Sequence, residues 1–394
     1  MKHILIVNET TFYYHLNHMF LGTGNKQENF DFLFNGVNVR RDGTPIGTPF
    51  IKNQIEMLND VLRIKSGDLI VFFVTGISKF YGIFRARNDI FLDNNYPSHL
   101  QNHLGINLTN RFQIEPYEVY ENGISEYEVL DKIGNIQQPQ EMMWSLIYRK
   151  LKGNRGSTMI FEHEYRTLYN RLVTNNVRLN SPNNCYSYNN INKRIVIANQ
   201  TNTITTNGTN IFNRNDISSA YYIEVQNAFA NGRAFEHYLH GLLMNDLVSN
   251  NSVVLNNLGL NGTVTYAGNE VGCGVGMQRI DSLVIIVNDN TLDICLIEVK
   301  YNRPNTNDIR TQINRYINWI EEYLVPIFLN TYTTVNLTPV ILAGKYTQNR
   351  RQQTLENQIS NLTFTSNNRR LSIQNTRYFT FDLTGNVFNL ILLV

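Results

Sequence analysis

Three charged residues stand at the ends of two neighbouring apolar segments of this sequence. Asp281 lies at the start of the run 280–287, and Glu298 and Lys300 close the run 292–299. Runs of β-branched residues of this length predict strands, and the intervening Asn-Asp-Asn predicts a tight turn. In the resulting hairpin Asp281 comes near Glu298 and Lys300, and the last two share a face because side chains alternate along a strand.

These three groups suit metal-assisted phosphate chemistry. Asp281 and Glu298 are predicted to be ligands of a hard divalent cation, Mg²⁺ or Mn²⁺, through their carboxylate oxygens. Such an ion polarises a phosphate and activates a water, while Lys300 stabilises charge or steers that water. The alternative is structural, with Asp281 capping a turn and Glu298 and Lys300 forming a surface ion pair.

Two flanking segments add further candidates. Residues 232–243 have apolar side chains at helical spacing, and Glu236 beside that stripe offers a third carboxylate. Residues 307–324 also read as a helix, with Gln312 and Arg315 on the flank of its apolar face. Gln312 is predicted to orient a water or a phosphate, and Arg315 to bind a phosphate. Solvated helix surface is the alternative for each of them.

The order of these elements resembles the PD-(D/E)XK nuclease core, and within it the NucS/EndoMS-like endonucleases. The resemblance covers residues 220–345 and rests on Glu236, Arg279-Ile280-Asp281, Glu298-Val299-Lys300 and the Gln-x-x-Arg-Tyr pattern from Gln312 to Tyr316. It implies catalytic roles for Asp281, Glu298, Lys300, Glu236 and Gln312, a mixed sheet flanked by helices, double-stranded DNA as substrate, and a homodimer. The glycine-containing segment 266–278 is expected to be a loop that follows the DNA backbone.

Length and composition limit the other classes of function. The chain has 394 residues, which predicts two domains, and its formal net charge is only +2. DNA contacts must therefore come from local basic clusters. The candidates are Arg40-Arg41, Arg85 and Arg87, the segment 149–155, Arg350-Arg351 and Arg369-Arg370.

The cysteines and the hydropathy point to one compartment. Cys185, Cys273 and Cys295 are too few and too scattered for a disulfide framework or a zinc site. No signal peptide and no run of membrane-spanning length is recognised. The sequence predicts a cytoplasmic protein without a membrane partner.

Residues 1–175 have a different order of predicted elements. Strands are predicted at 3–8, 67–76, 79–88 and 111–120, and helices at 50–62 and 157–172. This pattern predicts a small barrel or curved sheet. The Gly-Asp strand at 67–73 and the Phe-Tyr-Gly-Ile-Phe-Arg-Ala strand at 80–86 resemble EVE domains, relatives of YTH domains in the PUA-like superfold. The resemblance implies a DNA reader that holds a modified base.

The matching substrate-binding positions would be Asn8, Phe12, Tyr14, Phe73 and Thr75. Stacking between aromatic side chains and hydrogen bonds to the base edge are the physical basis of such a site. A core role is the alternative for each aromatic residue, because a barrel of this size also needs aromatic residues inside.

Residues 176–218 are rich in asparagine and threonine, which predicts a linker, with a hairpin over Asn207-Gly208 as an option. The chain is thus expected to be an α/β (α+β) protein with a barrel-like reader at 1–175 and a nuclease domain at 219–394.

Three functions remain open at this point. The first is a restriction endonuclease that depends on a modified base, and the second is a NucS-like mismatch- or structure-specific repair endonuclease. The third is a non-catalytic nucleic-acid binder. The intact Asp281, Glu298 and Lys300 favour an enzyme, and the EVE-like pattern favours restriction over repair.

Overall fold

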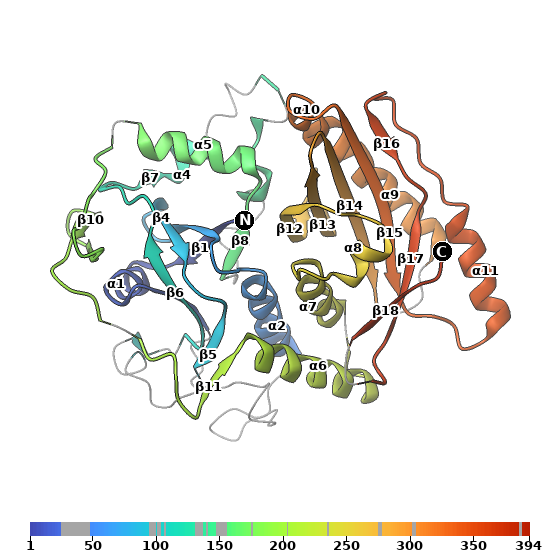
Figure 1. The fold of residues 1–394 in the computed structure, drawn as a ribbon, viewed down its shortest axis with the longest axis horizontal. Helices are drawn as coiled ribbons and strands as arrows, with labels where there is room; N and C mark the ends of the chain where they lie inside the picture. The colour runs from blue at the N-terminus through green and yellow to red at the C-terminus, as the bar shows by residue number, and fades with distance from the viewer. Residues whose placement is uncertain are drawn as a thin grey trace. The chain divides into compact units, whose positions relative to one another are not determined.

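The structure is a computed structural model of the chain (Figure 1). It describes residues 1–24, 48–93, 100, 104–105, 108–130, 137–138, 141–146, 156–174, 176–202, 204–234, 236–274, 278–301, 305–385 and 388–394. The chain divides into two compact units. Unit 1 comprises Met1–Asn135 and Ser145–Tyr221, and unit 2 comprises Ile136–Trp144 and Tyr222–Val394.

Unit 1 contains helices and short strands in alternation. Its elements are β1 (Lys2–Val7), α1 (Glu9–His18), β2 (Phe20–Thr23), α2 (Thr48–Leu62), β3 (Leu69–Val74), β4 (Lys79–Ala86), β5 (Phe91–Asp93), β6 (Asn110–Pro116), β7 (Ile124–Ser125), α4 (Glu126–Leu130), β8 (Ser157–Met159), α5 (Glu162–Val173), β9 (Tyr186–Asn189), β10 (Arg194–Ile197) and β11 (Ile211–Asn213). Two elements include residues of both units, the 3₁₀ turn η3 (Trp144–Leu146) and the helix α6 (Arg214–Ala230).

Apart from β9 and β10, the described strands of unit 1 form a mixed nine-stranded sheet in the order β11-β5-β6-β4-β3-β1-β8, with β2 on β6 and β7 on β4. β1 and β3 are parallel, with Ile4 beside Val71, and their carboxyl ends therefore lie at the same edge of the sheet. The other pairs in this sheet are antiparallel. The strands predicted from the apolar runs near residues 3–8, 67–76, 79–88 and 111–120 are confirmed.

The segment predicted as a linker, 176–218, groups with unit 1, and its described residues, 176–202 and 204–218, include three strands. β9 and β10 form an antiparallel hairpin, and Tyr188 and Ile195 are buried. Asn189 closes the turn, because its side-chain oxygen accepts from the backbone N–H groups of Ile191 and Asn192. The hairpin over Asn207-Gly208 was wrong, since β11 pairs with β5 instead. Asparagine-rich composition here reflects turn chemistry rather than a lack of structure.

Unit 2 is built on a second mixed sheet. Its elements are α7 (Glu236–Leu247), α8 (Val253–Asn257), β12 (Thr263–Gly272), β13 (Arg279–Asn288), β14 (Thr291–Lys300), α9 (Thr306–Trp319), the π-helical turn η4 (Ile320–Leu324), α10 (Val325–Phe328), β15 (Thr334–Ala343), α11 (Asn349–Ser360), β16 (Leu371–Ile373), β17 (Arg377–Asp382) and β18 (Asn389–Leu392). The strand order is β12-β13-β14-β15-β17-β18, with β16 also on β15 (Figure 1).

The predicted hairpin is confirmed. β13 and β14 are antiparallel, with Ser282 opposite Ile297 and Asn288 opposite Thr291, and β14 then pairs in parallel with β15. The chain is thus a mixed α/β protein, as the sequence predicted.

The two faces of the β13–β14 hairpin have different roles. Cys295, Ile297 and Val299 of β14 join a buried apolar cluster with Leu239 and Leu243 of α7. Because side chains alternate along a strand, the residues between them, including Glu298 and Lys300, project to the opposite face. One face of the hairpin therefore anchors α7, and the other is free to carry polar groups.

Among the described residues, no helix is both long enough and apolar enough to cross a membrane.

Several histidines of unit 1 are buried and neutral, which makes its stability depend on pH. His15 of α1 is 0% exposed and packs against Phe20 and Phe72, with ring centroids 4.8 and 5.8 Å away. Burial lowers the pKa of His15 to about 3 and that of His163 to about 4. The unfolded chain therefore takes up protons below pH 6.5 that the folded chain does not, and stability is lost as the pH falls from 6.5 toward 3.

We predict that the His15→Leu variant shows a shallower loss of stability in acid than the parent. Between pH 6.5 and 4 the titration of His15 alone should cost the parent roughly 3 kcal/mol of unfolding free energy, at about 1.4 kcal/mol per pH unit. Urea denaturation at a series of pH values measures this, with His18→Leu, a half-buried position one turn later, as the control. An unchanged pH dependence in His15→Leu would contradict the assignment.

Candidate active site

The strand ends of unit 2 bring the predicted catalytic residues together. Lys300 Nζ lies 2.6 Å from Glu298 Oε1 and 3.8 Å from Glu236 Oε1, so β14 and the first residue of α7 meet at this amine. The Glu298 side chain is 1% exposed. The surface ion pair considered from the sequence is therefore a pair between a buried carboxylate and a partly buried amine, with Glu236 of α7 beside it.

Asp281 joins the same site through the backbone. The last backbone pair of the β13–β14 ladder at this end is Ser282 with Ile297. Beyond it, the Asp281 side chain accepts the next hydrogen bond from β14. Its Oδ2 accepts a hydrogen bond from Val299 N at 2.8 Å. The carboxylate thus holds the open end of the hairpin together, at a fixed place between Glu298 and Lys300.

The electrostatics of the site favour an added cation. Burial, reinforced by the charge of Glu298, raises the pKa of Asp281 well above its ordinary value. Burial also raises the pKa of Glu298, against the opposing effect of Lys300. Burial acts to lower the pKa of Lys300, but the charges of Glu298 and Asp281 outweigh it, and the net shift is upward. One ammonium group is not enough to balance three neighbouring carboxylates.

The donor set fits a hard divalent metal. Glu298 Oε2 is buried and, within the described part of the chain, no group lies in hydrogen-bond geometry with it, although the neighbouring Asp281 carboxyl group is close enough to lower the pKa of Glu298. A buried carboxylate oxygen without a partner is costly unless a cation or a water occupies it. Carboxylate oxygens are the ligands that Mg²⁺ and Mn²⁺ prefer. Asp281 and Glu298 are the residues that would hold the ion, whereas Glu236 approaches Lys300 and does not form a compact three-carboxylate group with them in this structure.

Helix α9 supplies the far wall of the site. Tyr316 is buried, and its pKa is raised by burial and then by the charges of Glu298 and Asp281, so its hydroxyl lies near both carboxylates. Gln312 lies one turn earlier and is half-buried, whereas Arg315 is exposed. Arg315 is nevertheless near the site, because its charge acts on the pKa of the buried Cys273 thiol, which burial raises to about 12.

The sequence reasoning missed Tyr316 and Cys273 as site residues. For Tyr316 the signal was present, because Gln312 and Tyr316 are four residues apart and lie on the same helix face. For Cys273 the sequence held no signal, since its place at the site depends on how β12 pairs with β13.

The segment 266–278 differs from the loop that was expected. Residues up to Gly272 belong to strand β12, which pairs with β13 through Asn269–Ser282 and Val271–Ile280; 275–277 lie outside the described residues. Between these pairs, Glu270 has a positive φ of 45°, a left-handed conformation that costs a residue with a side chain roughly 1–2 kcal/mol. Glu270 Oε2 lies 3.0 Å from Arg279 Nη1, and Oε1 lies 3.6 Å from His237 Nε2.

The aromatic residues predicted to bind a base in unit 1 include two core residues. Phe12 is 0% exposed, with ring centroids 5.2, 5.1 and 5.0 Å from Phe72, Tyr81 and Tyr188. Phe73 is 1% exposed and packs on Phe80 at 4.8 Å. Assigning Phe12 and Phe73 to substrate binding was therefore wrong for this conformation, because neither ring has a face left for a base.

The other three predicted positions lie nearer the surface. Asn8 is exposed and caps α1, accepting from Thr11 N at 2.8 Å. Thr75 donates its hydroxyl to Val7 O at 3.1 Å. Asn8 and Thr75 thus follow the carboxyl ends of the parallel strands β1 and β3. Tyr14 is half-buried and its ring lies 5.9 Å from that of His18.

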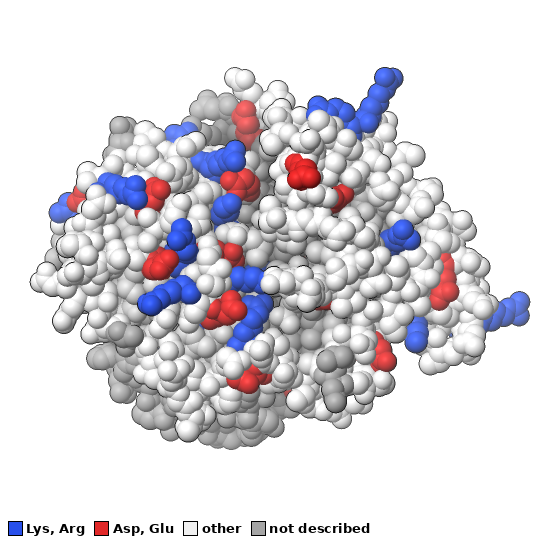
Figure 2. All heavy atoms as spheres, viewed as in Figure 1, with Lys and Arg blue, Asp and Glu red and all other residues white. Residues whose placement is uncertain are grey.

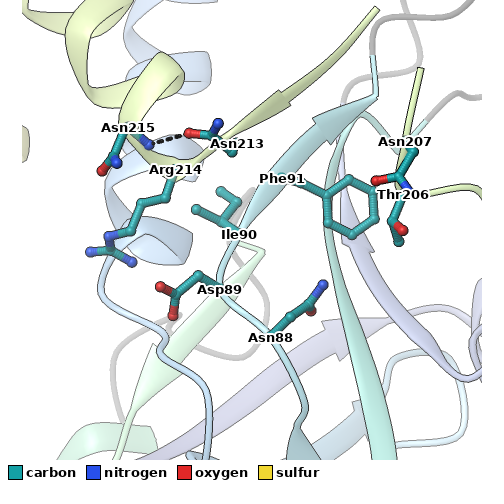
Figure 3. Close-up of a pocket in the computed structure, with 9 residues that line it drawn as sticks. All are labelled: Asn88, Asp89, Ile90, Phe91, Thr206, Asn207, Asn213, Arg214 and Asn215. Carbon is teal, nitrogen blue, oxygen red and sulfur yellow. Dashed lines mark hydrogen bonds between the residues drawn. The ribbon is translucent and has the colours of Figure 1, made fainter.

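Unit 1 also contains a polar pocket of about 430 Å³ (Figure 3). It lies between the β4–β5 connection and the residues around β11 and the start of α6. The lining residues are Asn88, Asp89, Ile90, Phe91, Thr206, Asn207, Asn213, Arg214 and Asn215. Amide groups dominate this surface. The sequence analysis did not identify it, because three separate segments contribute to it.

Some residues of the predicted basic clusters are described by the structure. Arg40-Arg41 and the segment 149–155 lie outside the described residues. Arg85 pairs with Glu115 at 3.5 Å, and Arg370 donates to the carbonyl groups of Leu329 and Tyr332. Figure 2 shows Lys and Arg side chains interspersed with Asp and Glu on the face drawn. Arg85 and Arg370 thus have structural partners.

Comparison with protein-family models gives no match for this sequence, and no curated protein is significantly similar to it. The relation to PD-(D/E)XK nucleases and EVE domains therefore rests on the motif residues named above.

The crowded carboxylates should make the site a source of instability. Because the folded-state pKa values of Asp281 and Glu298 are raised, the folded chain gives up its protons at higher pH than the unfolded chain does. Stability is therefore highest in acid with respect to these two groups and is lost as the pH rises from about 4 through the raised values.

We predict that Asp281→Asn stabilises the metal-free protein at pH 8 by roughly 0.5–2 kcal/mol, the usual gain when a strained functional group is relieved. The amide oxygen of asparagine can still accept from Val299 N, so the hairpin end is kept. Thermal unfolding in chelator measures the change, and added Mg²⁺ should then stabilise the parent more than the variant. A less stable Asp281→Asn protein would show that the carboxylate serves the fold instead.

Proposed function

We propose that the chain is a metal-dependent deoxyribonuclease of the PD-(D/E)XK type, in which unit 2 hydrolyses phosphodiester bonds. The observation that carries this proposal is the buried Asp281–Glu298–Lys300 group, with a Glu298 oxygen that accepts no hydrogen bond among the described residues. A purely structural ion pair has no need of two further carboxylates, because each adds uncompensated negative charge.

The residues divide the chemistry among them. When bound at Asp281 and Glu298, Mg²⁺ or Mn²⁺ supplies a Lewis acid for the phosphate and lowers the pKa of a water. The raised pKa of Lys300 keeps its ammonium group protonated near neutral pH, so Lys300 stabilises negative charge rather than accepting a proton. Glu298 holds that ammonium group at 2.6 Å and fixes its direction. Arg315, exposed on α9 near the site, binds the backbone of the DNA.

We predict that Glu298→Gln, Asp281→Asn and Lys300→Ala each lower DNA cleavage by roughly 100-fold or more, the cost of removing one electrostatic group from an active site. DNA binding should remain. Removal of divalent metal with a chelator should also stop cleavage, and Mg²⁺ or Mn²⁺ should restore it. Cleavage of a plasmid and a gel-shift measurement of affinity separate the two effects.

The matched control is Asp293→Asn. Asp293 is also an acidic residue of β14, but it lies at the other end of the strand and accepts from Asn336 Nδ2 at 2.9 Å. The Asp293→Asn protein should cleave DNA at the parent rate. A Glu298→Gln protein that cuts DNA at the parent rate would contradict the proposed active site.

Unit 1 is proposed to select the DNA target, and the polar pocket is the surface that supports this role. Asn88 Oδ1 accepts from Gln113 N at 2.7 Å, which leaves the Asn88 amide N–H₂ group as a donor for a ligand. Asn207 lines the same pocket beside Phe91 (Figure 3). Paired amide donors and acceptors are the groups that recognise the edge of a base. A volume of about 430 Å³ lies within the usual range for a small-molecule site.

We predict that Asn88→Asp and Asn207→Ala weaken DNA binding about 5- to 150-fold, because an amide contact to a base is worth roughly 1–3 kcal/mol. The full-length Glu298→Gln protein keeps the DNA intact during the measurement. Asn192→Ala, an exposed asparagine of the β9–β10 turn, is the control. Phe73→Ala should instead lose roughly 3–5 kcal/mol of folding stability, as expected for a core residue.

Duplexes with plain, methylated or hydroxymethylated cytosine, and a duplex with one mismatch, distinguish the two enzymatic alternatives in the same assay. A preference for a modified base supports restriction, and a preference for the mismatch supports repair. Equal affinity of the pocket variants and the parent for every duplex would remove the pocket from the proposal. A homodimer, which would supply two active sites for the two DNA strands, is proposed on the family resemblance alone.

A further inference from the structure

We propose that Glu270 is a positioning residue that sets the separation of the carboxylates Glu236 and Asp281, and that it acts through Arg279 and His237. This inference rests on the proposed metal-dependent function and deepens it. Glu270 is not one of the residues that carry the family resemblance.

The contacts of Glu270 connect the two elements that carry those carboxylates. One oxygen lies 3.0 Å from Arg279 Nη1, and Arg279 lies two residues before Asp281 on β13. The other oxygen lies 3.6 Å from His237 Nε2, and His237 directly follows Glu236 on α7. The Glu270 carboxylate of β12 therefore contacts a residue at the start of β13 and a residue at the start of α7.

The backbone supports the same conclusion. Asn269 pairs with Ser282 and Val271 pairs with Ile280, so Glu270 and Asp281 lie between the same two pairs of the β12–β13 ladder. The positive φ of 45° at Glu270 is a sparsely populated conformation for this residue type. Such a conformation persists where surrounding contacts hold it in place, and it is common beside functional sites.

Glu270 is partly buried, with 15% of its side chain exposed, and so are its partners, at 35% for Arg279 and 16% for His237. The Glu270–Arg279 ion pair, shielded in this way, is screened less by solvent than an exposed pair would be. Some residues contact a metal ligand but not the metal itself. Replacing such a residue typically weakens metal binding 10- to 100-fold.

Two mechanisms would make Glu270 important, and they predict opposite results for Arg279. If Glu270 positions the ligands, loss of either member of the Glu270–Arg279 pair loosens the site and weakens metal binding. If Glu270 acts only through its negative charge, Glu270→Gln weakens metal binding, but Arg279→Gln removes a nearby positive charge and strengthens it. The proposal commits to the first mechanism.

The experiment is calorimetric titration of Mn²⁺ into full-length parent, Glu270→Gln, Arg279→Gln and the double variant. We expect each single variant to raise the Kd about 10-fold or more. The double variant should be no weaker than the weaker single variant, because both substitutions break the same contact. Asp293→Asn should match the parent, and thermal unfolding should confirm that every variant is folded. Arg279→Gln provides the measurement if Glu270→Gln does not fold.

An unchanged Kd in both single variants, or tighter Mn²⁺ binding by Arg279→Gln, overturns the positioning role. DNA cleavage is measured on the same proteins. It distinguishes a failure of the positioning role of Glu270 from a failure of the proposed nuclease function. If the parent binds Mn²⁺ at a site lost in Glu298→Gln and the variants weaken it, but no protein cuts DNA, the inference stands and the nuclease proposal fails. A parent that binds no Mn²⁺ overturns both.

Discussion

The candidate site of unit 2 is organised by one unbalanced interaction, a buried carboxylate at Glu298 that has one cation, Lys300, beside it. Lys300 neutralises one charge, but Asp281 and Glu236 bring two more carboxylates to the same place. In a partly buried site this excess of negative charge is unfavourable. The raised pKa values of Asp281 and Glu298 follow from it. A divalent cation bound as proposed above would offset this excess of negative charge.

The same two strands build both the site and the core. On one face of β14, Cys295, Ile297 and Val299 pack under α7, and on the other face Glu298 and Lys300 meet Asp281. Alternation along the strand keeps these functions apart, although the residues are adjacent in sequence. Polar substitutions at 298 and 300 therefore act on the charge balance, whereas changes at 297 and 299 act on the packing of α7.

The sequence was sufficient where the chemistry was local. Apolar β-branched runs around an Asn-Asp-Asn turn predicted the β13–β14 hairpin, and strand alternation then placed Glu298 and Lys300 on one face. It was insufficient where the outcome depended on distant partners. An aromatic residue after a strand suits a cage or a core equally, and packing against distant residues, among them Tyr188, which lies 176 residues further on, makes Phe12 a core residue. Glu270 gave no signal, since its role depends on the pairing of β12 with β13.

The ends of strands explain why structural and functional polar residues look alike in sequence. Backbone N–H groups lose their ladder partners there, and a nearby side chain commonly accepts from them. Asn8 does this for Thr11 N, and Asn213 does it for the N–H groups of Asn215 and Asp216, so both have evident structural roles. Asp281 does the same for Val299 N, but Glu298 beside it keeps a buried oxygen that accepts nothing from the described residues. In this chain the buried Glu298 oxygen beside Asp281 is the acceptor that the proposed metal would satisfy.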